Sequence, residues 1–457
     1  MSDIVFFSSL LICISLGCYY KKISDAGLKR NYGTGLGILL ACVICGQQIF
    51  YTAIMVWGNL IIIKCCDRRY MHQLCLTFTW IFLIYLHFNT YTKYALWIYQ
   101  AMALRLVGLA FEMHHAQLAK SDQTKSNSRL NMGDFDFLTK DPSAVEIITY
   151  AYFFIGLHKG PYYRWKTFED HFSSNFSSLG DYRVITEHKL KKVILCYIGF
   201  LLLRMKFSDE MYYTKKFYTN FGSDFRYLYN IPHLVMHFLY HQIIMLLCTS
   251  VCTEAGFGVY PAICTPLPGA GPTTRISILK VLRNESTEKA FEEEYNFSAI
   301  KCFHTERVIM GPRMRDTIRS WYMPTRFWFW ANIYKSVIKA NKEVRSAISF
   351  LLWTMWVGPS VPHLVVSATL WVHIHLETEY SNLYDTDGPM KLPWDIGFSI
   401  MRMFCLIYLT PCLIINNNTY AVLRYYNSIF WVYHIVLVAL MIASVVIYKW
   451  RGGDAVT

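Results

Sequence analysis

The residues best suited to chemistry lie within or beside long apolar runs. Arg315 and Arg319 are four residues apart, so a helix would place both guanidinium groups on one face. Such a pair suits an anionic ligand such as a pyrophosphate, or the headgroup zone of a membrane as a basic surface helix. His237 and His241 have the same spacing, which can serve zinc, but neither a third ligand nor an HExxH order accompanies them. We therefore predict no metal site.

A second cluster of candidate residues alternates aromatic rings with cations. Residues 160–168 read Gly-Pro-Tyr-Tyr-Arg-Trp-Lys-Thr-Phe and place Arg164 among the rings. Pro161 fixes the backbone at a turn. Amphipathic rings beside Arg and Lys are typical of the lipid headgroup zone, so this segment is either an interfacial belt or part of a binding site for a phosphate-bearing ligand.

The elements that must position these residues are membrane helices. The chain has 457 residues, of which 54% are hydrophobic and 16% charged, whereas a soluble domain has about 25% charged residues. A membrane-spanning helix needs about 20 apolar residues, and the sequence therefore predicts an all-α polytopic membrane protein. The uncharged runs cover residues 4–20, 33–63, 70–92, 227–253, 347–376, 403–423 and 425–448.

The net charge of +13 would suggest nucleic acid as the partner of a soluble protein. In a membrane protein, Lys and Arg in cytoplasmic loops set the topology and contact anionic lipids. We therefore expect membrane lipids, and no nucleic acid, as partners.

Residues 33–63 are too many for one upright helix and too few for two, and we expect a break at Gly46-Gln47-Gln48. The short runs 147–157 and 193–203 predict re-entrant, tilted or interfacial helices packed against protein. No internal repeat is visible, which disfavours a transporter and predicts one membrane domain over residues 1–457. The segments between the membrane blocks are a polar loop at 118–144, and loops and surface helices at 262–320.

A series of short motifs extends nearly from end to end of the chain. They are Lys21-Lys22, Gly27-Leu28-Lys29-Arg30, Gly160-Pro161, Ala255-Gly256-Phe257-Gly258, Tyr260-Pro261, Gly271-Pro272-Thr273, Arg313 with Arg315-Asp316 and Arg319, Trp321 with Met323, Ile333-Tyr334-Lys335-Ser336, Arg345-Ser346-Ala347, Leu351-Leu352, and Trp356 with Gly358. This series resembles the membrane-bound O-acyltransferase (MBOAT) family, and within it the lysophosphatidylinositol acyltransferase branch.

The resemblance implies an MBOAT fold with roughly 9–11 membrane helices, plus re-entrant and interfacial helices around a central chamber. It implies a multi-pass protein of the endoplasmic reticulum membrane that uses acyl-CoA as co-substrate, needs no other cofactor, and takes lysophosphatidylinositol from the membrane. The substrate-binding residues that it implies are Arg164, Arg315, Arg319, Trp321, Lys335, Trp356 and Gly358.

The two catalytic positions of the family are substituted in this chain. In the family a His deprotonates the acceptor hydroxyl and an Asn positions the reactants, and a general base contributes ~10²–10⁴-fold to the rate. The gap-free match places the His position at Val357 and the Asn position at Tyr322. Valine has no proton acceptor, and tyrosine is bulkier than asparagine. His363, six residues beyond Val357, is a weak substitute.

Two functions therefore stay open. In the first, the chain transfers an acyl group from acyl-CoA to a lysophospholipid during phospholipid remodelling, and another base or the geometry of the substrate replaces the His. In the second, it is a catalytically inactive MBOAT pseudoenzyme that binds lipid or acyl-CoA or regulates an active relative. The residues favour the second function, and inheritance within the family favours the first.

Overall fold

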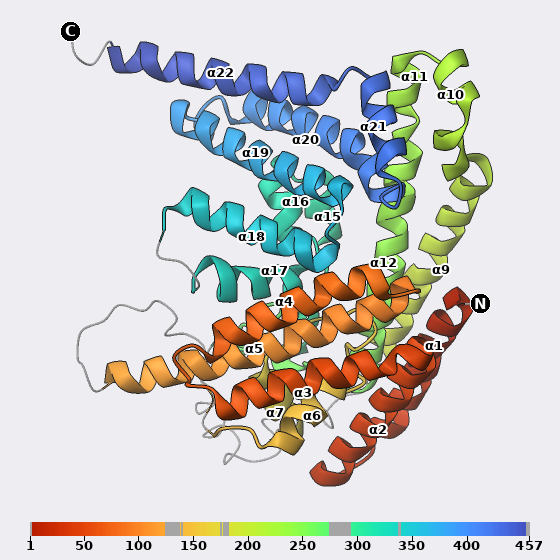
Figure 1. The fold of residues 1–457 in the computed structure, drawn as a ribbon, viewed down its shortest axis with the longest axis vertical. Coiled ribbons are helices and arrows are strands. Elements are labelled where there is room, and N and C mark those ends of the chain that lie inside the picture. Colours follow the sequence, from red (N-terminus) through yellow and green to blue (C-terminus); the bar gives the residue numbers. More distant parts are fainter. Residues whose placement is uncertain are drawn as a thin grey trace. The chain divides into compact units, whose positions relative to one another are not determined.

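The computed structural model describes residues 2–123, 138, 140–173, 176, 182–273, 294–336 and 340–453. Nearly all regular structure in this part of the chain is helical (Figure 1). A two-residue strand β1 (Tyr260–Pro261) pairs antiparallel with β2 (Tyr295–Asn296). The all-α architecture predicted from the sequence is confirmed.

The chain forms two compact units. Unit 1 comprises Met1–Ile194, Ile244–Cys302 and Tyr322–Lys339, and unit 2 comprises Leu195–Ile243, Phe303–Trp321 and Ala340–Thr457. The single membrane domain over 1–457 stays a prediction. Of the predicted polar loop at 118–144, residues 124–137 and 139 lie outside the described residues, as do residues 274–293 of the predicted segment 262–320.

Unit 1 is built mainly from the N-terminal helices. They are α1 (Ser2–Lys21), α2 (Ala26–Cys45), η1 (Gly46–Gln48), α3 (Ile49–Cys65), α4 (Met71–Asn89), α5 (Lys93–Gln123), α6 (Ala144–Tyr152), α7 (Trp165–Ser173), η3 (Ala262–Cys264), η4 (Ser298–Ile300), α17 (Met323–Phe329) and the π-helical turn η5 (Trp330–Tyr334). Helices α9 (Arg183–Lys206) and α12 (Asn230–Glu254) contribute residues to both units.

Unit 2 contains the C-terminal helices and the basic segment. Its elements are η2 (Asp209–Tyr213), α10 (Lys215–Asn220), α11 (Ser223–Leu228), α15 (Thr305–Met310), α16 (Met314–Ser320), α18 (Lys342–Val357), α19 (Val361–Leu383), α20 (Lys391–Ile414), α21 (Thr419–Ser428) and α22 (Val432–Gly453). A core of buried aromatic and aliphatic side chains from α19–α22, including Tyr408, Tyr425 and Tyr426, holds them together.

Seven helical segments in the described part of the chain are long and apolar enough to cross a membrane, fewer than the roughly 9–11 expected by resemblance to the family. One of them, Ala26–Cys65, is interrupted at η1, where Gly46 has φ +55°, as the sequence predicted. The segments are Ser2–Lys21, Ala26–Cys65, Met71–Asn89, Lys93–Ala119, Ser223–Glu254, Lys391–Ile414 and Val432–Arg451.

Two predicted runs have different limits in the structure. The uncharged run 347–376 is divided between α18 and α19, because Pro359 disfavours helical backbone at Gly358 and the Ser360 side chain caps the new helix. Residues 193–203 are not a separate short helix but part of the longer helix α9, because the charged residues on either side of them also favour helix.

Arg105 organises the interior of unit 1. The residue is 1% exposed. Its guanidinium group donates to the carbonyls of Tyr150, Ala151 and Phe153 at 3.2, 3.2 and 2.8 Å, and also to that of Ile155. The last carbonyls of a helix have no partner within it, so Arg105 on α5 satisfies the end of α6 and the turn that follows.

Candidate functional site

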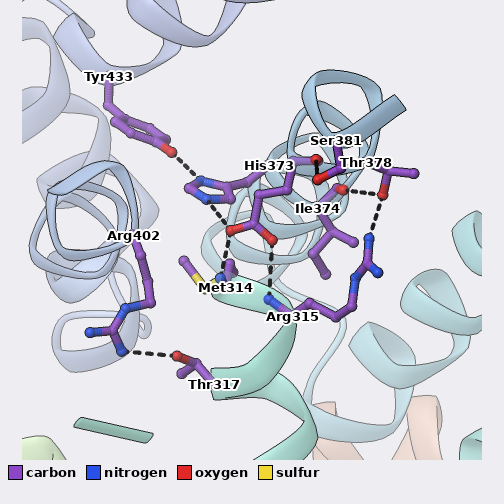
Figure 2. A network of polar contacts seen from close by, with 10 residues as sticks. Met314, Arg315, Thr317, His373, Ile374, Thr378, Ser381, Arg402 and Tyr433 are labelled. Carbon is purple, nitrogen blue, oxygen red and sulfur yellow. Dashed lines mark hydrogen bonds and ion pairs between the residues drawn. The ribbon is translucent and has the colours of Figure 1, made fainter. Parts of the chain in front are cut away.

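The basic helix α16 is held at its N-terminus by Glu377 of α19. Figure 2 shows Met314 and Arg315 at the start of α16, with His373 and Thr378 of α19 beside them. The Glu377 carboxylate accepts hydrogen bonds from the backbone N–H groups of Met314 at 2.5 Å and of Arg315 at 3.3 Å. The first N–H groups of a helix lack partners within it and carry partial positive charge. A carboxylate there satisfies both requirements and fixes the start of α16.

Glu377 is itself held by His373. The His373 Nε2 lies 3.1 Å from Glu377 Oε1, and the His373 Nδ1 is hydrogen-bonded to the Tyr433 hydroxyl. Both Glu377 and His373 are almost completely buried. Helix α16 is also held by α20, because Arg402 of α20 donates a hydrogen bond to the Thr317 hydroxyl at 3.0 Å.

No role was predicted for Glu377 from the sequence, and its positioning of α16 was missed. The spacing of four residues indicates only that His373 and Glu377 share a helix face, whereas the contact with α16 joins segments 62–63 residues apart and has no local signal.

Arg315 and Arg319 of α16 line one open cavity. Arg315 Nη2 donates to the Thr378 hydroxyl at 2.7 Å, and Arg313 Nη2 lies 3.0 Å from Asp387 Oδ1. The cavity has a volume of about 380 Å³ and is lined by Pro312, Arg313, Arg315, Asp316, Arg319, Asp387, Lys391 and Asp395. Four cations face three carboxylates there, which suits a polar ligand that carries phosphate.

Trp321 follows α16 and lies in an aromatic cluster of unit 2. Its ring centroid is 4.9 Å from that of Phe303, 5.6 Å from that of Phe238 and 6.2 Å from that of His241. The cluster brings His237 and His241 together, with ring centroids 4.4 Å apart. The predicted role of Trp321 in substrate binding stays a prediction.

Val357 is the last residue of α18 and is followed by Gly358 in an extended conformation. Trp356 and Val357 are half-buried, and the predicted roles of Trp356 and Gly358 in binding are not tested by this geometry. His363 lies in the first turn of α19, where its Nδ1 is 2.8 Å from the Ser360 hydroxyl. That contact ties the His363 ring to the helix cap.

Tyr322, which the sequence predicts to occupy the family's Asn position, has a left-handed backbone with φ +44° and ψ +52° as the N-cap of α17. Asparagine is several-fold enriched in this region, whereas a bulky residue there is an outlier. The backbone at this position in unit 1 is therefore one that suits asparagine, although tyrosine occupies it. The Lys159 ammonium lies 5.7 Å from the centroid of the Tyr322 ring.

Arg164 and Lys335 are engaged in contacts within unit 1. Arg164 Nε lies 3.4 Å from Glu112 Oε2, and both side chains are largely buried. The Glu112 carboxylate also accepts from the Trp165 backbone N–H at 2.9 Å. Lys335 Nζ lies 4.0 Å from the Trp330 ring centroid, directly after the π-helical turn. The substrate-binding roles of Arg164 and Lys335 stay predictions.

Comparison with known proteins places this arrangement in a family. The model of the membrane-bound O-acyltransferase (MBOAT) family matches residues 69–417. The chain is 25% identical to the membrane-bound acylglycerophosphatidylinositol O-acyltransferase frj of Drosophila melanogaster, with 95% of this chain and 90% of the relative covered.

Human MBOAT7, which carries the same enzyme name, is 27% identical, with 94% of this chain and 91% of the relative covered. The mboa-7 protein of Caenorhabditis elegans, also so named, is 23% identical over 78% of this chain and 75% of its own length. Because the family match covers most of the chain, this protein belongs to the membrane-bound O-acyltransferase family.

Proposed function

We propose that the protein transfers an acyl group from acyl-CoA to a lysophospholipid, with lysophosphatidylinositol as the acceptor, in phospholipid remodelling at the endoplasmic reticulum membrane. The observation that carries this proposal is the similarity, over nearly the full length of both chains, to relatives named acylglycerophosphatidylinositol O-acyltransferase. Seven helical segments in the described residues that are long and apolar enough to span a membrane support a multi-pass protein whose acceptor is a lipid.

The cavity beside α16 supports a role in binding the phosphates of a substrate. Arg315, Arg319 and Lys391 line it together, and guanidinium groups bind phosphate oxygens through charge-assisted hydrogen bonds. The anchor at Glu377 holds the α16 backbone, so less freedom is lost when an anion binds.

The reaction needs a proton acceptor but no cofactor. The acceptor hydroxyl loses its proton and its oxygen attacks the thioester carbonyl carbon. The carbon–sulfur bond then breaks, and the departing CoA thiolate takes up a proton. Val357 cannot accept a proton, so the base must be another group. The inactive pseudoenzyme is the outcome against which this proposal is tested.

The test is an assay of the purified, lipid-reconstituted protein with lysophosphatidylinositol and arachidonoyl-CoA, following free CoA and phosphatidylinositol. We expect turnover, and we expect the Arg315→Ala/Arg319→Ala double variant to raise the KM for acyl-CoA. Arg424→Ala is the matched control, because Arg424 stacks on the Tyr218 ring away from the cavity lining. If the wild type shows no turnover and the Val357→His/Tyr322→Asn double variant does, the protein is a pseudoenzyme with an intact chamber.

A further inference from the structure

Lys159 has an unusual position in unit 1. It lies between α6 and α7, outside the seven candidate spans, and is half-buried. Its ammonium nitrogen is 3.6 Å from the ring centroid of Trp97 on α5 and 5.7 Å from that of Tyr322. A cation over aromatic faces is stabilised by about 0.5–2 kcal/mol, so the two rings hold the amine at the family's Asn position.

This contact is relevant because the family's Asn position is where the reactants are oriented. The histidine that would accept the proton is absent at Val357, whereas Lys159 carries a nitrogen that can accept one. Resting on the function proposed above, we propose that Lys159 is the general base of the acyl transfer, replacing the family's histidine.

The surroundings of Lys159 favour its neutral, proton-accepting form. The pKa of Lys159 is lowered to about 7, chiefly by burial and to a smaller extent by the positive charge of Lys93, while Cys248 acts in the opposite direction. Lys93 is itself paired with Asp3 at 3.6 Å. A lysine in an apolar setting is a known form of general base, because a base works best when its pKa is near the operating pH.

The proposed step balances without any further reactant. The neutral Lys159 amine takes the proton of the acceptor hydroxyl as the hydroxyl oxygen forms a bond to the thioester carbonyl carbon. The carbon–sulfur bond breaks and its electron pair leaves with the CoA thiolate. The Lys159 ammonium then protonates that thiolate, which regenerates the neutral amine and releases CoA as a thiol.

Two histidines, His158 and His363, are less suited to this role. His158 is 1% exposed, its Nε2 is 3.1 Å from the Ser9 hydroxyl, and its ring packs edge-on against Phe6. These contacts bury His158 against α1. His363 is tied to the Ser360 cap of α19. The Lys159 nitrogen, by contrast, faces the Tyr322 ring at 5.7 Å from its centroid.

Lys159→Arg separates the base from the packing role. Arginine keeps the positive charge and stacks on aromatic rings, but it cannot be deprotonated near neutral pH. We expect kcat to fall ~10²–10⁴-fold with the KM for acyl-CoA unchanged. Lys189→Arg is the matched control, since Lys189 is also half-buried, has a pKa lowered to about 8 by burial, and faces the Phe297 ring at 6.0 Å. We expect that variant to keep the wild-type rate.

Two further readouts distinguish a base from a structural residue. The wild-type kcat/KM should rise as the pH passes through about 7, because the amine must be neutral to accept a proton, and the rise should be absent in Lys159→Arg. In Lys159→Ala, added ethylamine should restore turnover in proportion to its unprotonated fraction. Wild-type turnover in Lys159→Arg, or a lack of rescue in folded Lys159→Ala, overturns the assignment of the base. An inactive wild type refutes the proposed function itself and removes this inference with it.

Discussion

Replacing Glu377 by alanine should destabilise unit 2 and displace the basic helix. Glu377 is 3% exposed and accepts three hydrogen bonds, from Met314 N–H at 2.5 Å, Arg315 N–H at 3.3 Å and His373 Nε2 at 3.1 Å. Of these donors, Met314 and His373 are buried.

The magnitude follows from the donors that would lose their acceptor. Each buried donor left unsatisfied costs about 1–3 kcal/mol, so Glu377→Ala should lower the free energy of unfolding by about 2–6 kcal/mol. Glu377→Gln keeps one acceptor oxygen and should lose about half of that value. Because α16 carries Arg315 and Arg319, the KM for acyl-CoA should be higher in Glu377→Gln than in the wild type, and higher still in Glu377→Ala.

The assay is denaturant unfolding in lipid micelles followed by circular dichroism, together with acyl-CoA kinetics. Glu379→Ala is the matched control on the same helix, since its carboxylate is 36% exposed and 4.0 Å from His375. An exposed pair of this kind contributes about 0–1 kcal/mol. If Glu377→Ala destabilises no more than Glu379→Ala, the anchoring role of Glu377 is wrong.

Three other substitutions test the fold of unit 1. Gly37→Val should abolish folded protein, because a Cβ at Gly37 would overlap the Tyr152 carbonyl oxygen. A Cβ at Gly35 meets nothing within 4 Å, so Gly35→Val should fold, and detergent size-exclusion profiles compare the two variants. Arg105→Leu removes the donor to several buried carbonyls and should cost more than ~3 kcal/mol of stability in the same unfolding assay; near-wild-type stability would contradict it. Tyr322→Asn should reduce the strain of the left-handed backbone by ~1 kcal/mol but remove a contact of similar energy between the ring and Lys159. The free energy of unfolding of this variant should therefore stay within ~1 kcal/mol of that of the wild type.

Local sequence signals predicted most elements of the fold, and their failures have physical causes. Gly46 and its two Gln neighbours interrupt the run 33–63 as expected. The uncharged run 347–376 joined parts of α18 and α19 into one predicted segment, because the absence of charge does not indicate where a helix ends. Pro359 did indicate a break, since the residue before a proline disfavours helical backbone. The uncharged run 193–203 was likewise predicted as a separate short helix, although it is part of α9. The charged residues on either side of it do not end the helix, since Lys and Glu have high helix propensity.

The candidate site was predictable only where its geometry is local. Arg315 and Arg319 share a face by helical spacing and do line one cavity. Glu377 reaches the start of α16 from 62–63 positions along the chain, and no periodicity encodes that contact. Lys159 likewise meets Trp97 and Tyr322 through the packing of unit 1. Contacts between distant segments depend on tertiary packing, so these two residues emerged only from the structure.

The turn at Tyr322 shows how a site can change its chemistry while the fold is retained. The next residue, Met323, donates its backbone N–H to the Cys302 carbonyl at 2.9 Å, and Pro324 leaves no room for a Cβ at Gly269. These neighbours fix the left-handed backbone whatever side chain it carries, at a cost of ~1–2 kcal/mol for a residue other than glycine or asparagine. The predicted replacement of the family's Asn and His by Tyr322 and Val357 therefore need not disturb the scaffold. Activity depends instead on which groups now occupy the site, and Lys159 beside Tyr322 is the proton acceptor that we propose.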